Sequence, residues 1–190
     1  MPSNAFAIHL QQLLQDALEL DAAYDGLRSG SPGPQRGLAP LNRAAVVLSV
    51  SAWESYIEEL MRESLQALLP PGGAVGVWPA LSAYVLGLLG RFNTPDTGNV
   101  DLLINRCLSI SNISAFWGWQ NCTSAQAIAR LDALLTLRHE IAHGVNPRPV
   151  ITNEYSSSLP HFIRNLARCT DQSVRDQLVN AHNVANPWPL

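Results

Sequence analysis

The stretch LDALLTLRHEIAHG, residues 131–144, decides the fold class, because its apolar residues recur at the spacing of one helix face. Thr123 or Ser124 is suited to cap the N-terminus of this segment, since both side chains can accept a hydrogen bond from the first helical turn. Gly144 is suited to end it just after His143. The sequence therefore predicts an amphipathic helix from about residue 123 to 143.

The same helical spacing recurs through most of the chain, and segments rich in proline and glycine separate the periodic stretches. Further helices are predicted over residues 4–27, 40–69, 79–90, 99–109 and 160–182. A loop is predicted over residues 29–40 and a tail over 183–190, and no stretch alternates as a strand would. We therefore predict an all-α helical bundle that forms a single domain over residues 1–190, with a long second helix.

The composition limits the classes of function. The chain has 190 residues, of which 47% are hydrophobic and 14% are charged, and its net charge is −3. No apolar run approaches the ~18 residues of a membrane span, and no basic segment precedes an apolar one at the start, so we expect a cytoplasmic protein without membrane contact. The negative balance disfavours sequence-blind coating of nucleic acid, although all 12 cationic residues are arginine.

Several reactive or aromatic side chains have no partner in the sequence pattern. Cys107, Cys122 and Cys169 form no C-x-x-C pair, so we expect reduced thiols rather than a zinc or disulfide framework. Trp117 and Trp119 lie in a predicted loop and are expected to pack inward. The other histidines and serines belong to no site that the sequence indicates, and they do not suggest a hydrolase triad. They are His9, His161, His182, Ser49, Ser51 and Ser55.

Arg138 occupies the core-facing arc of the predicted helix over 123–143 when that helix is projected at about 100° per residue. A guanidinium keeps its charge, so this position calls for an anionic partner. Glu54 falls inside the apolar stripe of the helix over 40–69 and is the natural partner if the two helices pack together. Two interpretations stay open: a structural ion pair, or a pair that holds the arginine at a polar cleft.

The segment also contains the H-E-x-x-H pattern of zinc hydrolases, formed by His139, Glu140 and His143. No third histidine follows at a metalloprotease spacing in GVNPRP, and Glu154 and His161 are the remaining candidates for a third ligand. A zinc hydrolase is therefore a third hypothesis, and the leading interpretation assigns no metal.

The same residues form an R-x4-H pattern, from Arg138 to His143. Together with NRAAVVLSVSAWESYIEEL, residues 42–60, and the stretch over 131–144, this pattern resembles the HEPN (higher eukaryotes and prokaryotes nucleotide-binding) superfamily. The similarity is greatest to the HEPN families found beside bacterial RNA-repair and defence genes. It implies a HEPN-like helical bundle whose motif lies on a later helix, and a metal-independent endoribonuclease that needs no cofactor.

The chemistry of metal-free RNA cleavage suits these residue types. Histidine, with an ordinary pKa near ~6.5, can move protons at neutral pH, and arginine offers forked donors to phosphate oxygens. The resemblance implies that His143 is the general acid and base and that Arg138 clamps the phosphate. His139 would be a supporting donor, Glu54 would orient Arg138, and Asn42 would line the cleft.

The family resemblance also predicts partners. It implies a homodimer with a composite site about a two-fold axis, in which Arg43 and Arg148, doubled by symmetry, would bind RNA. A toxin or defence effector with an antitoxin or regulatory protein as partner follows from the resemblance alone. The alternative is a non-catalytic HEPN-like module that uses the same cleft for nucleotide or RNA binding, or for dimerisation.

Overall fold

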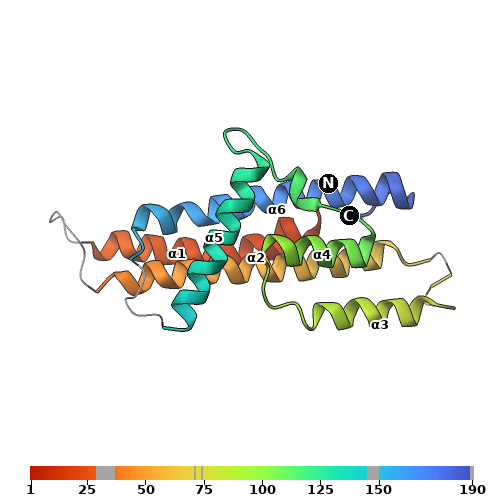
Figure 1. Cartoon of the computed structure of the whole chain (residues 1–190), viewed down its shortest axis with the longest axis horizontal. Coiled ribbons are helices and arrows are strands. Elements are labelled where there is room, and N and C mark those ends of the chain that lie inside the picture. The colour runs from red at the N-terminus through yellow and green to blue at the C-terminus, as the bar shows by residue number, and fades with distance from the viewer. Residues whose placement is uncertain (29–36, 71, 74, 145–149, 189–190) are drawn as a thin grey trace.

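The computed structural model describes residues 1–28, 37–70, 72–73, 75–144 and 150–188. The described residues confirm the all-α prediction, since they form no β-strand and only one isolated bridge, between Trp119 and Cys122. The elements are η1 (Ala5–Leu10), α1 (Gln11–Leu27), α2 (Ala39–Ala67), α3 (Trp78–Leu89), α4 (Thr97–Leu108), η2 (Ile113–Phe116), α5 (Ser124–Ala142) and α6 (Asn153–His182) (Figure 1).

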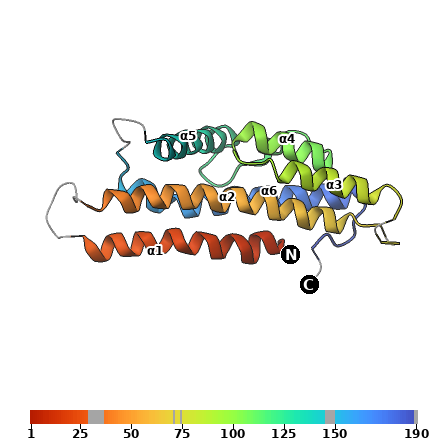
Figure 2. The ribbon, with the colours of Figure 1, turned by 90° about the horizontal axis from the view of Figure 1, so that it is seen from below.

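Helix α2 is the centre of the bundle and contacts every other α-helix. Figure 2 shows α1 on one side of α2 and α6, and helices α3, α4 and α5 on the other side. Helix α5 crosses the three long helices at a steep angle (Figure 1). This layering leaves the C-terminal end of α5 at the edge of the bundle. None of the described helices combines the length and hydropathy that a membrane crossing requires.

The core is built around the aromatic residues of α2. Trp53 and Tyr56 are fully buried and stack with ring centroids 5.7 Å apart, and Trp117 meets Trp53 edge-on at 5.8 Å. Each of their polar atoms has a partner: Trp53 Nε1 donates to the Pro95 carbonyl at 2.9 Å, and the Tyr56 hydroxyl donates to a carbonyl of α6 at 2.8 Å. Trp117 Nε1 donates to Thr170 Oγ1 at 2.8 Å. The inward packing predicted for Trp117 is confirmed.

Helix α5 begins and ends as the sequence predicts. Thr123 Oγ1 accepts from the Gln126 amide at 3.3 Å, and Gln126 Oε1 accepts from the Thr123 amide at 2.8 Å, so a capping box fixes the first turn. His143 is the C-terminal cap, and Gly144 follows with a φ of +64°, a conformation that strains any other residue. The motif residues therefore lie in the last turn.

The predicted start of the last helix at Pro160 is wrong, because α6 begins at Asn153. Thr152 caps this earlier start by accepting from the Tyr155 amide at 3.2 Å. Pro160 is buried inside the helix, where its missing N–H leaves the carbonyl one turn back without a helical donor. The Thr152 cap and the burial of Pro160 stabilise the helix by more than the missing hydrogen bond costs.

The other predicted boundaries lie within two residues of the observed ones. The first predicted helix is divided into a π-helical turn, η1, and α1. Residues 29–36 of the predicted loop lie outside the described residues, and helix α2 already includes Ala39 and Pro40. The predicted tail packs onto the body through Trp188, which is only 4% exposed.

Candidate functional site

The last turn of α5 extends past the core and exposes the motif residues. Leu131, Leu134 and Leu135 are buried, whereas Ala142 and His143 are exposed. In Figure 1 this end of the helix lies beyond α2, at the edge of the molecule. The sequence needs polar side chains here because the helix continues about two turns past its last buried leucine.

His139 and His143 form a close, tilted pair of rings on the surface. They are one turn apart on α5, and their ring centroids lie 4.2 Å apart with the planes tilted by 44°. Both side chains are exposed. Two imidazoles that solvent and substrate can reach are therefore presented together, as proton transfer to and from a bound ligand requires.

Arg138 directly precedes His139 on α5 and is partly buried. Burial raises the pKa of the Glu54 carboxyl on α2, and the charge of Arg138 acts in the opposite direction. The ion pairs found among the described residues do not include one between Arg138 and Glu54 within 4.0 Å. The two side chains therefore interact electrostatically without a direct ion pair among the described residues.

Two further predicted site residues, Asn42 and Arg43, lie at the start of α2 rather than in the helical turn that holds the histidine pair. Asn42 is buried, and its Nδ2 donates to the Ile151 carbonyl at 2.9 Å, which ties the start of α2 to the segment before α6. This bond gives Asn42 a structural role. Arg43 is partly buried, at the N-terminal end of α2 and roughly 17 Å along the helix axis from Glu54. Arg148 lies outside the described residues.

A third metal ligand is not brought to the histidine pair. Glu154 is exposed in the first turn of α6, and His161 bonds Asn165 at 2.9 Å on the same helix. Within the part of the chain that the structure describes, no group of three or more histidine, cysteine or acidic side chains could hold a metal ion. The H-E-x-x-H interpretation therefore gains no ligand set from these residues.

A shallow surface depression adjoins His139, and the sequence gives no sign of it. It is lined by residues of α5 and of the segment that enters α4: Thr94, Asp96, Gly98, Asp132, Leu135, Thr136 and His139. The Thr97 amide donates to Asp132 Oδ1 at 3.1 Å, which fixes the entry of α4 against α5. The α3–α4 connection thus forms one wall of the candidate site, through a tertiary contact that no local pattern predicts.

One serine of α2 has a histidine partner that the sequence pattern does not reveal. His9 Nε2 and Ser55 Oγ lie 2.8 Å apart, between η1 and α2. A nucleophilic serine also needs amide donors for the developing oxyanion, whereas the amides around Ser55 belong to the interior of a long helix. Next to this contact the Glu63 carboxylate accepts from the Asn4 amide at 3.0 Å and the Ala5 amide at 2.6 Å. The His9–Ser55 bond belongs to the same set of contacts that hold η1 on α2.

The three cysteines are free, as predicted. Burial raises the pKa of the Cys107 thiol to about 11 and also raises the pKa of Cys169. Because the thiolate is the reactive form, these two side chains are poor nucleophiles at neutral pH.

Comparison with known proteins adds no relative: no family model matches this chain, and no curated protein or solved structure is similar to it. The chemistry of the site therefore has to be inferred from the side chains themselves. Among the described residues, the end of α5 offers two accessible imidazoles, one guanidinium and a nearby carboxylate.

Proposed function

We propose that this protein is a metal-independent endoribonuclease whose active site is the last turn of α5. The observation that carries the proposal is the close, exposed pair of His139 and His143 in the same helical turn as Arg138. Histidine can take and give protons near neutral pH, and a guanidinium stabilises a crowded phosphate. Both functions are needed when RNA is cut without a metal.

In the proposed reaction His143 removes the proton of a 2′-hydroxyl, and the 2′-oxygen attacks the adjacent phosphorus. A bond forms between the phosphorus and the 2′-oxygen, and the bond to the 5′-oxygen breaks after a negatively charged phosphorane has formed. Arg138 donates to the phosphorane oxygens, and a protonated histidine delivers a proton to the leaving 5′-oxygen. The products end in a 2′,3′-cyclic phosphate and a 5′-hydroxyl.

Glu54 would act as a positioning residue. Its carboxyl lies close enough to Arg138 for the arginine's charge to affect its pKa, but no ion pair within 4.0 Å joins them among the described residues. An anion at this distance attracts the guanidinium without satisfying its donors, so the donors stay available to a phosphate. His139 would support the same phosphate or share the proton transfer.

The resemblance to HEPN proteins extends the proposal to a HEPN-like bundle that forms a two-fold dimer. In that arrangement each protomer adds its own Arg138 and His143, and one histidine accepts a proton while the other donates one. A regulatory protein or antitoxin and a role in defence or toxicity rest on this resemblance alone.

The test is cleavage of RNA by the purified protein in EDTA, with the product ends analysed for 2′,3′-cyclic phosphate. We expect cleavage by the natural chain and a loss of about 10²–10⁴-fold in rate for His143→Ala and about 10²–10³-fold for Arg138→Ala. Matched controls are His161→Ala and Arg62→Ala, because both residues lie on other helices and are exposed. The controls should cleave like the natural chain.

Three results would overturn the proposal. Cleavage that stops in EDTA and returns with zinc would indicate the H-E-x-x-H hydrolase. Absence of cleavage with RNA binding that depends on Arg138 would indicate the non-catalytic module. Equal loss of activity in the control variants would show that the effects come from elsewhere in the chain.

A further inference from the structure

A second groove lies between α3 and α4, on the other side of the connection that walls the candidate site. Its lining residues are Leu88, Arg91, Phe92, Asn93, Thr94, Asn99, Leu102, Leu103 and Arg106. Its volume is about 220 Å³, below the roughly 300–1,000 Å³ of pockets that enclose a whole small molecule. The groove is therefore suited to one unit of a chain rather than to a complete cofactor.

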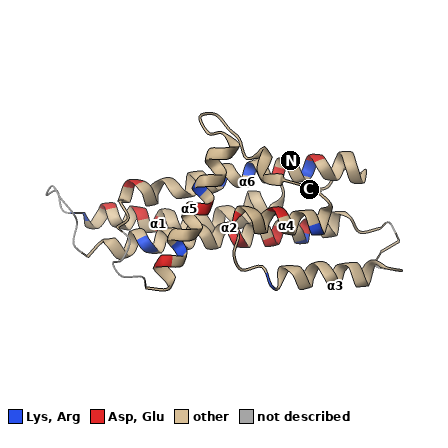
Figure 3. Ribbon diagram, viewed as in Figure 1, with Lys and Arg blue, Asp and Glu red and all other residues tan. Residues whose placement is uncertain are grey.

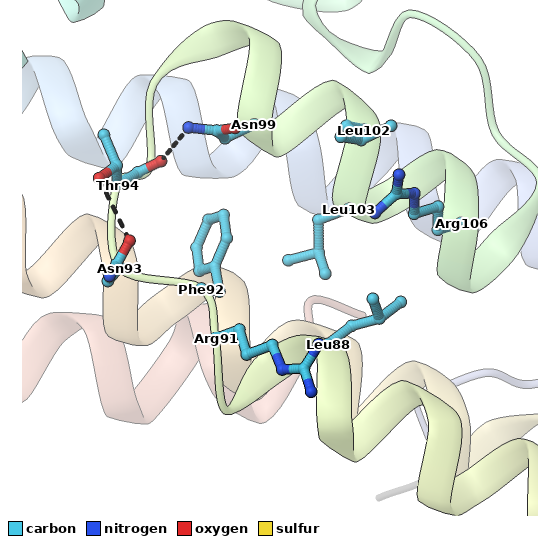
Figure 4. A pocket seen from close by; sticks show the side chains of 9 residues that line it. All are labelled: Leu88, Arg91, Phe92, Asn93, Thr94, Asn99, Leu102, Leu103 and Arg106. Carbon is cyan, nitrogen blue, oxygen red and sulfur yellow. Dashed lines mark hydrogen bonds between the residues drawn. The ribbon is translucent and has the colours of Figure 1, made fainter.

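Two positive charges flank this groove. Figure 4 shows Arg91 on the α3 side and Arg106 on the α4 side, with Leu88 and Leu103 between them and the Phe92 ring toward the end formed by Asn93 and Thr94. Both arginines are exposed, and neither belongs to an ion pair found among the described residues. Helix α3 has no charged residue from Trp78 to Leu89 (Figure 3).

Two acidic side chains of this region, Asp96 and Asp101, do not line the groove. Asp96 accepts from the Asn99 amide at 2.8 Å and from Asn99 Nδ2 at 3.0 Å. Asp101 accepts from the amide of Ser114 at 2.9 Å and from its hydroxyl at 2.6 Å. Because the described lining holds two arginines and no acidic side chain, the groove is a local positive site on a chain whose net charge is −3.

The floor and one end of the groove suit a nucleobase. Phe92 and Leu88 are partly buried and Leu103 is buried, so the floor is apolar and includes an aromatic ring. At the end, Asn93 Oδ1 accepts from Thr94 Oγ1 at 3.3 Å, and Asn99 Nδ2 donates to the Thr94 carbonyl at 3.0 Å. These bonds leave the Asn93 amide nitrogen as a donor and the Asn99 amide oxygen as an acceptor, which matches the mixed edge of a base.

The groove adjoins the depression beside His139, because Thr94 lines both. We propose that the groove binds a nucleotide of the same RNA strand that the end of α5 cleaves, with Arg91 and Arg106 on its phosphates and Phe92 against its base. Paired arginines with an aromatic floor form the pattern by which proteins hold single-stranded nucleic acid. This inference rests on the proposed function for the identity of the strand.

The test uses a short, fluorescently labelled oligoribonucleotide of mixed sequence that is 2′-O-methylated throughout, so that it cannot be cleaved by 2′-oxygen attack. Binding is measured by anisotropy at low salt, where phosphate contacts are least screened. We expect the double variant Arg91→Gln/Arg106→Gln to weaken binding by at least about tenfold and to reduce the slope of log K against log salt by ~2. The matched control is Arg62→Gln/Arg175→Gln; these arginines lie on α2 and α6, away from the groove, and each pairs with an acid of its own helix.

A second measurement locates the contact directly. The same oligonucleotide carrying 4-thiouridine is irradiated on the intact protein, and the crosslinked peptide is identified by mass spectrometry. We expect the adduct within the segment around Phe92. Substitution of two exposed arginines should leave the thermal midpoint unchanged, which separates a binding defect from unfolding.

The outcomes separate this inference from the proposed function. If the natural chain cleaves RNA while the arginine double variant binds and cleaves equally well, the groove assignment is wrong and the α5 site stands. If the natural chain does not cleave RNA but the double variant loses binding, the groove is supported and the ribonuclease proposal is wrong. Binding of an acidic peptide at this groove in preference to the oligonucleotide would overturn the assignment of a nucleic acid.

Discussion

Two arginines on α5, about two turns apart, have opposite surroundings. Arg130 is held in place: it donates to Ser158 Oγ at 2.6 Å, and its guanidinium carbon lies 4.4 Å from the centroid of the Phe162 ring. Arg138 is partly buried too, but no hydrogen bond or ion pair to another side chain is found for it among the described residues, where the charge of Glu54 acts on it. Arg130 joins α5 to α6, whereas under the proposed function the donors of Arg138 bind a phosphate.

The two ends of the helix differ in the same way. The N-terminal end has a capping box and three buried leucines in its middle turns, whereas the C-terminal turn carries exposed histidines. A helix held at one end and open at the other presents polar side chains on a rigid support, which is what a catalytic site needs. Variants at matched positions in the two halves can test this division.

The largest difference in stability should appear between alanine variants of Leu131 and His143. Leu131 is fully buried, so Leu131→Ala should lower the free energy of unfolding by about 2–5 kcal/mol. His143→Ala removes an exposed side chain and should change it by less than about 0.5 kcal/mol. Urea denaturation of both variants measures these free energies. A large loss of stability in His143→Ala would contradict the view that the C-terminal turn of α5 is not part of the core.

The next largest difference in stability should appear between variants of Arg130 and Arg138. Arg130→Met loses the bond to Ser158 and the contact with the Phe162 ring, so we expect a loss of about 1–2 kcal/mol. Arg138→Met should cost less at neutral pH, because it breaks no hydrogen bond found among the described residues. Equal losses in denaturant titrations would show that both arginines are structural.

A smaller effect is expected at the cap. Thr123→Ala removes one half of the capping box and should cost about 1 kcal/mol. Thr136→Ala is the matched control on the same helix, because the Thr136 hydroxyl donates only to the Asp132 carbonyl one turn back, at 3.0 Å. The thermal midpoint of Thr123→Ala should lie below that of the natural chain, and the midpoint of Thr136→Ala should lie close to it. The reverse order would disprove the role of the cap.

The smallest effect is a change in pH dependence. Burial raises the pKa of Glu54 and the charge of Arg138 opposes this, so Arg138→Met should raise that pKa further. For an acid whose pKa is raised on folding, the stabilising contribution is present below its unfolded pKa and is lost as the pH rises through its folded pKa. The cost of Arg138→Met should therefore be greater at pH 7 than at pH 4. A Glu54 pKa that stays constant or falls in an NMR titration would show that the two side chains do not interact.

Local patterns predicted most of the helices and the limits of α5, since Thr123 and Gly144 act through contacts within one turn. The start of α6 was missed because a proline favours the first turn of a helix, and the cap at Thr152 together with the burial of Pro160 overrides that preference. Helical projection placed Arg138 and Glu54 on the apolar sides of their helices and suggested them as partners, but it could not give the distance between them.

Contacts between distant segments could not be predicted in this way. The bond between His9 and Ser55 and the groove around Phe92 depend on how η1, α3 and α4 pack on the rest of the bundle. The family resemblance suggested that Asn42 lines the cleft, yet its amide is used by the Ile151 carbonyl. A polar residue on an apolar face is thus a candidate whose partner only the tertiary structure reveals.

The central claim is that the end of α5 cuts RNA through its 2′-hydroxyl without a metal. The most direct measurement places a single ribonucleotide at the mapped cleavage position of an otherwise deoxy oligonucleotide and follows cleavage in EDTA. The account predicts a cut only after that ribonucleotide, leaving a 2′,3′-cyclic phosphate, with His143→Ala inactive. Cleavage of the fully deoxy oligonucleotide, or unchanged cleavage by His143→Ala, would contradict it.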